Sequence, residues 1–136
     1  MKRVASFFCL VNFLLIAVGC DSAKDRTYDV SGTVNLDKKP LQEGQIKFAD
    51  SSGQVPAVIT ITDGKYKGKA RAGSYNVEIC AFRPSQKVIP KGPGMDKEER
   101  QQENYLPERF NTKSQLKMAE VTPSGPNNFD FEVESK

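Results

Sequence analysis

The sequence YNVEICAF, residues 75–82, decides the fold class. Its odd-numbered positions carry Tyr75, Val77, Ile79 and Ala81, while its even-numbered positions carry Asn76, Glu78, Cys80 and Phe82. A period of two is typical of a β-strand with one buried face, and Pro84 ends the pattern because proline interrupts a strand. We expect this strand to lie near the centre of a sheet.

Similar alternation occurs on both sides of this strand. The segments that show it are residues 28–36, 46–48, 57–62, the stretch from Tyr66, residues 116–121 and residues 128–133. Turn sequences separate them, among them Asp37-Lys-Lys-Pro40 and Asp63-Gly64, and Asp-Gly favours a tight hairpin. The pattern predicts an all-β domain, a single seven-stranded β-sandwich.

One long excursion separates the fifth and sixth expected strands. Prolines and glycines interrupt residues 84–112, and only residues 95–105 contain enough helix-forming side chains for a helix. Three apolar side chains follow, Tyr105, Leu106 and Phe110. We expect Leu106 and Phe110 to pin the excursion onto the sandwich, and the alternative is that all three contact a partner.

The amino terminus has the layout of a secretory signal peptide. Lys2 and Arg3 precede an apolar run, residues 4–18, and Gly19 and Cys20 follow it. The run is shorter than the roughly 20 apolar residues of a membrane-spanning helix. We therefore expect residues 1–19 to be removed.

The segment Ala17-Val-Gly-Cys20 resembles the lipobox of bacterial lipoproteins. That resemblance implies that Cys20 becomes the first mature residue and that its sulfur carries a membrane-embedded lipid, which places the protein on a membrane of the bacterial cell envelope, facing the periplasm or the exterior. Residues 20–26 then form a polar tether and residues 27–136 the folded domain. Soluble secretion and an uncleaved anchor are the alternatives.

Charge and cysteine content limit the partners. The chain has 20 Lys and Arg and 17 Asp and Glu residues, and Lys2 and Arg3 leave with the signal peptide. The nearly neutral mature chain therefore argues against nucleic-acid binding. Cys80 has no partner for an internal disulfide, because the other two cysteines are Cys9 in the signal peptide and Cys20.

A second resemblance covers nearly all of the mature chain. The order Val30-Ser-Gly-Thr-Val34, Pro40-Leu41, Asp63-Gly64 and Ala72-Gly-Ser-Tyr-Asn-Val77 is similar to that of carboxypeptidase regulatory-like, or transthyretin-like, domains. Residues 104–111 and the end Asn128-Phe-Asp-Phe131 resemble a subgroup of small envelope lipoproteins that carry this domain. The resemblance implies an immunoglobulin-like or transthyretin-like sandwich and says little about activity.

The composition excludes several catalytic classes. The chain contains no histidine, which removes Ser-His-Asp and Cys-His catalysis and zinc-histidine sites. Carboxylate-dependent hydrolysis would have to use Glu98, Glu99, Glu103 and Glu108, which lie in a charged stretch where we expect solvated side chains. Calcium would have to use such residues as Asp63, Asp130 and Glu132, which we expect to serve as a turn former and outward strand residues.

We therefore expect a non-enzymatic envelope lipoprotein without a cofactor, a structural or protein-interaction module held on a membrane by lipid at Cys20. An envelope protein or a glycan is the expected partner, and Cys80 is expected to be a packed, inert thiol. The alternative is a module whose loops bind a glycan, a small ligand or calcium.

Overall fold

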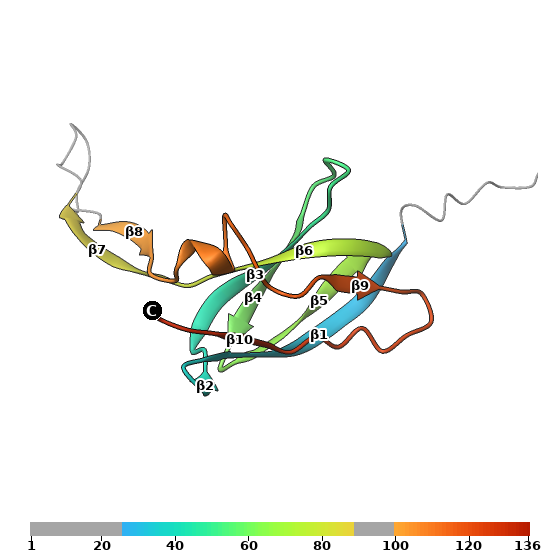
Figure 1. Ribbon diagram of the computed structural model, residues 1–136, viewed down its shortest axis with the longest axis horizontal. Coiled ribbons are helices and arrows are strands. Elements are labelled where there is room, and N and C mark those ends of the chain that lie inside the picture. Colours follow the sequence, from blue (N-terminus) through green and yellow to red (C-terminus); the bar gives the residue numbers. More distant parts are fainter. Residues whose placement is uncertain (1–25, 89–99) are drawn as a thin grey trace, which may run out of the picture.

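A computed structural model describes residues 26–88 and 100–136, and the protein in these ranges is all-β, as the sequence predicts (Figure 1). One short 3-10 helix, η2 (Glu108–Phe110), accompanies the strands. The strands are β1 (Thr27–Leu36), β2 (Lys39–Pro40), β3 (Glu43–Ala49), β4 (Ala57–Thr62), β5 (Lys65–Arg71), β6 (Gly73–Cys80), β7 (Phe82–Val88), β8 (Arg100–Asn104), β9 (Ala119–Val121) and β10 (Phe131–Val133).

Most strands belong to one curled, largely antiparallel sheet with the order β10-β1-β5-β4-β3-β6-β9. The junction between β4 and β5 is narrow, because only two residue pairs join them beside their hairpin, whereas seven pairs join β1 to β5. The sheet can therefore fold over at this junction and enclose its apolar face. In Figure 1, β6 runs along the upper side of the body and β1 and β10 run along the lower side.

The core fills the inside of the curl. The inward positions of β6, Tyr75, Val77 and Ile79, are at most 7% exposed, and Ala81 after the strand is fully buried, as the alternation predicts. Phe48 of β3 lies at the centre, with its ring centroid 6.0–6.3 Å from those of Tyr66, Tyr75 and Phe129. The other buried apolar side chains are Val30, Val34, Leu41, Ile46, Ile59, Ile61, Ala70, Leu106, Phe110, Ala119, Val121, Phe131 and Val133.

Two predicted turns are confirmed, and both are tight. Asp37 and Lys38 have φ angles of 49° and 66°, and Asp63 and Gly64 have φ angles of 49° and 72°. Positive φ at both central residues is the backbone of a type I′ turn, whose twist matches that of the flanking strands. The turns join β1 to β2 and β4 to β5.

The segment before β10 closes the curl by running parallel to β1. The Ser31 amide donates to the carbonyl of Asn127 at 3.0 Å, and the Phe129 amide donates to the carbonyl of Ser31 at 2.9 Å. The side-chain amide of Asn127 donates to the carbonyls of Asp29 and Thr122, so that it ties the end of β9 to β1. Such parallel contacts join residues almost 100 positions apart.

The structure corrects three expectations. All seven predicted strands occur, but β2, β7 and β8 are additional, and the strands form one curled sheet and a separate two-stranded sheet. The possible helix over residues 95–105 lies partly outside the described residues, and its later part, Arg100–Asn104, is strand β8. The strand at residues 75–82 is not central, because β6 stands next to the edge strand β9 and β4 occupies the middle of the order.

Candidate interaction site

The most distinctive surface feature is a projecting two-stranded sheet, β7 and β8, which we call the arm. It extends from the body in the direction opposite to the start of β1 (Figure 1). Only Ala81 separates β7 from β6, so the arm continues a core strand. A two-stranded ribbon is at best marginally stable by itself, and the contacts at its base therefore decide whether it keeps its orientation.

The base of the arm is organised by the side chain of Asn104. Its Oδ1 accepts hydrogen bonds from the backbone amides of Ala81, at 3.1 Å, and Leu106, at 3.2 Å. The Tyr105 amide donates to the carbonyl of Ala81 at 3.0 Å. These bonds fasten the end of β8 to the end of β6, at the point where the regular sheet of the body stops.

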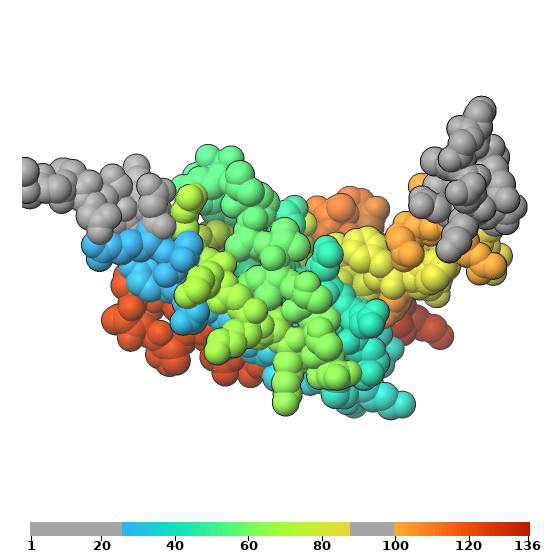
Figure 2. All heavy atoms as spheres, turned by 180° about the vertical axis from the view of Figure 1, so that it is seen from behind, coloured from blue at the N-terminus to red at the C-terminus, as the bar shows by residue number. Residues whose placement is uncertain are grey.

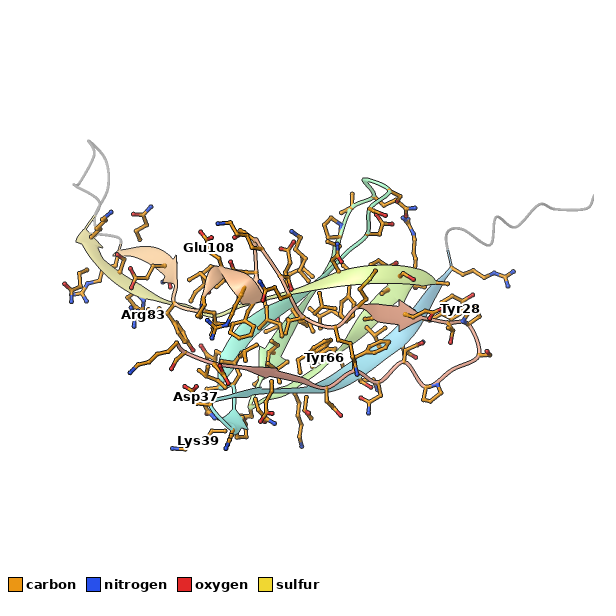
Figure 3. The ribbon with its side chains drawn as sticks, in the orientation of Figure 1. Tyr28, Asp37, Lys39, Tyr66, Arg83 and Glu108 are labelled. Carbon is orange, nitrogen blue, oxygen red and sulfur yellow. The ribbon has the colours of Figure 1, made fainter. Side chains whose placement is uncertain are left out.

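Arg83 adds a charged contact at the same place (Figure 3). Its Nε lies 2.8 Å from Oε1 of Glu103, and its guanidinium carbon lies 5.6 Å from the ring centroid of Tyr105. The hydrogen bond from Arg83 lowers the pKa of Glu103 below its ordinary value. Both charged side chains are exposed, so the pair orients the arm more than it stabilises the fold.

The structure places the three predicted contact residues in different environments. Leu106 and Phe110 are 5% and 8% exposed and belong to the core, whereas Tyr105 is half-buried. Asn111 holds the turn between them, since its side-chain amide donates to the carbonyls of Leu106 and Pro107. Leu106 and Phe110 therefore anchor the excursion in the core, as expected. Of the three residues, only Tyr105 has a side chain that is accessible to a partner in this conformation.

Sequence reasoning missed Phe82 as a candidate contact residue. This aromatic side chain is 46% exposed at the start of the arm. With Gln102 of β8 and residues of β3 and β4, among them Gln45 and Thr60, it borders a shallow hollow of about 290 Å³. The available signal was an aromatic residue at an outward strand position, two residues before the proline that ends the alternation.

A second, larger groove of about 650 Å³ lies between η2 and the segment that ends at Lys136. Arg109 lines it, with its guanidinium carbon 4.7 Å from the Phe110 ring centroid. The guanidinium also pairs with Glu134 and donates to the carbonyl of Lys136. The Arg109 guanidinium in this groove is thus already paired with oxygen atoms of the protein.

The acidic residues considered for calcium are engaged elsewhere or exposed. Asp63 is a turn residue, Glu132 is exposed on β10, and Oδ1 of Asp130 accepts from the amide and the hydroxyl of Thr33, each at 2.8 Å. These bonds lower the pKa of Asp130. Among the described residues, no three His, Cys, Asp or Glu side chains are grouped as a metal site would need.

The glutamates considered for hydrolysis are not gathered around a cleft in the described part of the chain. Glu103 pairs with Arg83, and Glu108, labelled in Figure 3, pairs with Lys113. Glu98 and Glu99 lie outside the described residues. Paired, exposed carboxylates lack the burial that raises a pKa for acid catalysis.

Cys80 is a half-buried free thiol at the end of β6. Burial, followed by the nearby charge of Glu78, raises its pKa, which disfavours the reactive thiolate. Cys20, the predicted site of lipidation, lies outside the described residues, as do the predicted signal peptide and nearly all of the predicted tether.

Comparisons with known proteins give no identification. No known protein family, curated protein or solved structure matches the chain. Within the described ranges, no helix has the length and apolar character needed to cross a membrane. The function must therefore be argued from the residues themselves.

Proposed function

We propose that the protein is a non-enzymatic lipoprotein of the bacterial cell envelope that presents a transthyretin-like β-sandwich to a protein partner. The observation that carries the proposal is the order of three segments: an apolar run followed by Gly19 and Cys20, a short polar stretch, and a folded domain that begins at Thr27. A lipid on Cys20 would hold the domain at a membrane surface.

The sheet topology supports the sandwich part of the proposal. The narrow junction between β4 and β5 divides the sheet into a β10-β1-β5 layer and a β4-β3-β6-β9 layer. Side chains from both layers meet around Phe48, as the inner faces of a sandwich do. The absence of histidine from the whole sequence supports a role without acid-base catalysis near neutral pH.

The arm supports the interaction part of the proposal. It is a separate two-stranded sheet, so each strand has an outer edge that no other described strand covers. Unpaired strand edges accept an additional strand from a partner, and exposed aromatic side chains such as Phe82 strengthen such contacts. Tyr105 and Arg83 lie at the base, where they would border the same partner.

The 650 Å³ groove beside η2 favours a second candidate, the binding of a small ligand or a glycan. Its lining combines the apolar side chains of Phe110 and Leu116 with the charges of Arg109 and Glu134. Calcium binding has no corresponding support among the described residues, because the candidate carboxylates are not grouped.

Cross-linking in intact cells tests the proposal. A photoreactive residue placed at Phe82 or Gln102 should capture a specific envelope protein, and Cys20→Ser should abolish the capture by releasing or stalling the protein. The matched control is a photoreactive residue at Asn76, an exposed position on β6 of the body. The same products from arm and control positions would contradict an arm-specific partner, and a rise in melting temperature with oligosaccharides would favour the groove.

A further inference from the structure

The outward face of β5 carries an uninterrupted row of basic side chains, Lys65, Lys67, Lys69 and Arg71, which we call the basic row. The residues between them face the other way: Tyr66 and Ala70 are buried in the core. The row therefore follows from strand alternation, which places every second residue on one face. β5 contains no acidic residue, so its outer surface is strongly positive.

Neighbouring groups neutralise only part of this charge. Lys69 pairs with Asp29 of β1 at 2.9 Å, and Arg71 donates to the side chain of Gln54 at 2.7 Å. Lys65 and Lys67 form no ion pair within the described ranges. The outward side of β3 and β6 differs, because there Lys47 is matched by Glu78 at 2.9 Å and Glu43 adds a negative charge.

Hydroxyl groups surround Lys65 and Lys67, the end of the basic row that forms no ion pairs with the part of the chain that the structure describes. Lys65 and Lys67 line a shallow hollow of about 670 Å³, with Ser31 and Thr33 from β1 on one side and Thr60 and Thr62 from β4 on the other. Asn128 and Asp130 complete its border, and Asp130 is already bonded to Thr33. Ammonium and hydroxyl donors together suit phosphate oxygens. β4 and β5 occupy the middle of the face shown in Figure 2.

The basic row begins at the tethered end of the domain. Thr27, the first residue of β1, pairs with Arg71, the last residue of β5. Seven residue steps separate Thr27 from Cys20, and seven steps of extended chain span at most about 25 Å. A domain tethered this closely has a high effective concentration at the membrane. A positively charged surface near the tether can therefore bind anionic headgroups there.

We propose that the basic row lies against anionic phospholipid headgroups of the membrane that holds Cys20. The proposal rests on the proposed lipid anchor. It adds an orientation: the β5 side faces the membrane, while the arm, at the opposite end of the body from Thr27, stays available to a partner (Figure 1). Each lysine near an anionic leaflet strengthens membrane association about fivefold, and added salt weakens it.

Lysine footprinting of the intact protein tests this orientation. The protein is purified from membranes, reconstituted in phosphatidylcholine vesicles with or without phosphatidylglycerol, and labelled with an amine-reactive reagent. Labelling of Lys65 and Lys67 should fall several-fold in the anionic vesicles and recover in high salt. Lys87 of β7 and Lys113, which are exposed and lie outside β1, β4 and β5, serve as internal controls and should not change.

A matched pair of triple variants gives a second measurement. Backbone hydrogen exchange around Arg71 should be slower in anionic than in neutral vesicles. Lys65→Gln, Lys67→Gln and Lys69→Gln together should abolish that difference, whereas Lys47→Gln, Lys87→Gln and Lys113→Gln, with the same change in net charge, should preserve it. Equal labelling in neutral and anionic vesicles would overturn the proposal, as would equal effects of the two variants. Protection by soluble heparin but not by anionic vesicles would also overturn it and assign the row to an anionic glycan.

The same digest separates this inference from the anchor. The mass of the peptide that contains Cys20 reports acylation independently of lysine labelling. An acylated Cys20 peptide together with full labelling of Lys65 and Lys67 in anionic vesicles would contradict the proposed orientation and support the lipid anchor. If Cys20 carries no lipid but added anionic vesicles still protect the lysines in a salt-sensitive way, the basic row binds lipid headgroups and the proposed anchor is wrong.

Discussion

Replacing Gly32 by alanine should destabilise the domain through a single close contact. Gly32 lies in β1 where the segment before β10 crosses beside it, and its α-carbon has no room for a side chain. An added methyl group would overlap the carbonyl oxygen of Phe129 and stand 2.8 Å from the Tyr66 hydroxyl. The backbone of residues 127–129 would have to move away from β1.

The cost can be worked out from the bonds that this movement breaks. The amides of Ser31 and Phe129 form one hydrogen bond each between the segment and β1, at 3.0 and 2.9 Å, and the Tyr66 hydroxyl donates to the Phe129 carbonyl at 2.6 Å. Each bond contributes about 1 kcal/mol, and a buried hydroxyl left without a partner costs about 1–3 kcal/mol. We expect Gly32→Ala to lower the free energy of unfolding by about 3–5 kcal/mol, a large part of the 5–15 kcal/mol typical of a domain.

Urea denaturation measures this loss, and two further variants show its cause. Gly53→Ala is the control, because no atom lies within 4 Å of the added methyl group and the cost should stay near 1 kcal/mol, from the positive φ of 77° alone. Tyr66→Phe removes only the third hydrogen bond. The double variant of Gly32 and Tyr66 should be less destabilised than the sum of its parts, because both changes break the same bond. A Gly32→Ala protein as stable as the Gly53→Ala protein would refute the reasoning.

Three other perturbations test separate parts of the structure. Val77→Asp places a charge at a fully buried position of β6 and should lower the free energy of unfolding by more than about 4 kcal/mol. A cooperative urea transition close to that of the parent would show that this face of β6 is not buried. Asn104→Ala removes the acceptor of the Ala81 and Leu106 amides and should speed hydrogen exchange at these amides and in β8, with little change in β1; uniform exchange would contradict a local role. Asp130→Asn should lower the melting temperature at neutral pH. The lowered pKa of Asp130 means that its contribution is present above the ordinary aspartate pKa and is lost as the pH falls through the folded-state value, so the two proteins should converge in acid, and a difference that persists there would reject the assignment.

Strand alternation predicted the body of the fold because one face of each strand is buried. The inward side chains of β6 and the turns at Asp37 and Asp63 follow from a period of two and from turn chemistry, which are local properties. The alternation over residues 28–36 also puts Gly32 on the same face as Val30 and Val34. The reason for glycine there emerged only from the structure, since the chain that crosses it lies almost 100 residues away.

The arm could not be predicted from the same signals. β8 consists of Arg100, Gln101, Gln102, Glu103 and Asn104, which favour a helix in isolation, yet pairing with β7 makes them a strand. β7 contains Pro84, which reads as the end of a strand. Tertiary pairing therefore overrides local preference. The burial of Leu106 and Phe110, together with the exposure of Phe82, moves the proposed contact surface toward Phe82.

The basic row shows how a fold can concentrate positive charge on one face of a protein whose net charge is small. Without Lys2 and Arg3 the sequence is nearly neutral in charge, but alternation gathers four basic side chains on the outside of β5, whose Arg71 end pairs with the start of β1. Net charge hides such a row because β5 itself has no acidic residue, and the carboxylates that balance the charge, Asp29 of β1 among them, lie on other elements. The proposed membrane contact therefore depends on the strand register as well as on Cys20.

Mass spectrometry of the mature protein isolated from cells tests the membrane anchor most directly. The account predicts an amino-terminal peptide that begins at Cys20 and carries a diacylglyceryl group on its sulfur, in protein found in the membrane fraction. An unmodified Cys20 in protein released into the soluble fraction would contradict it.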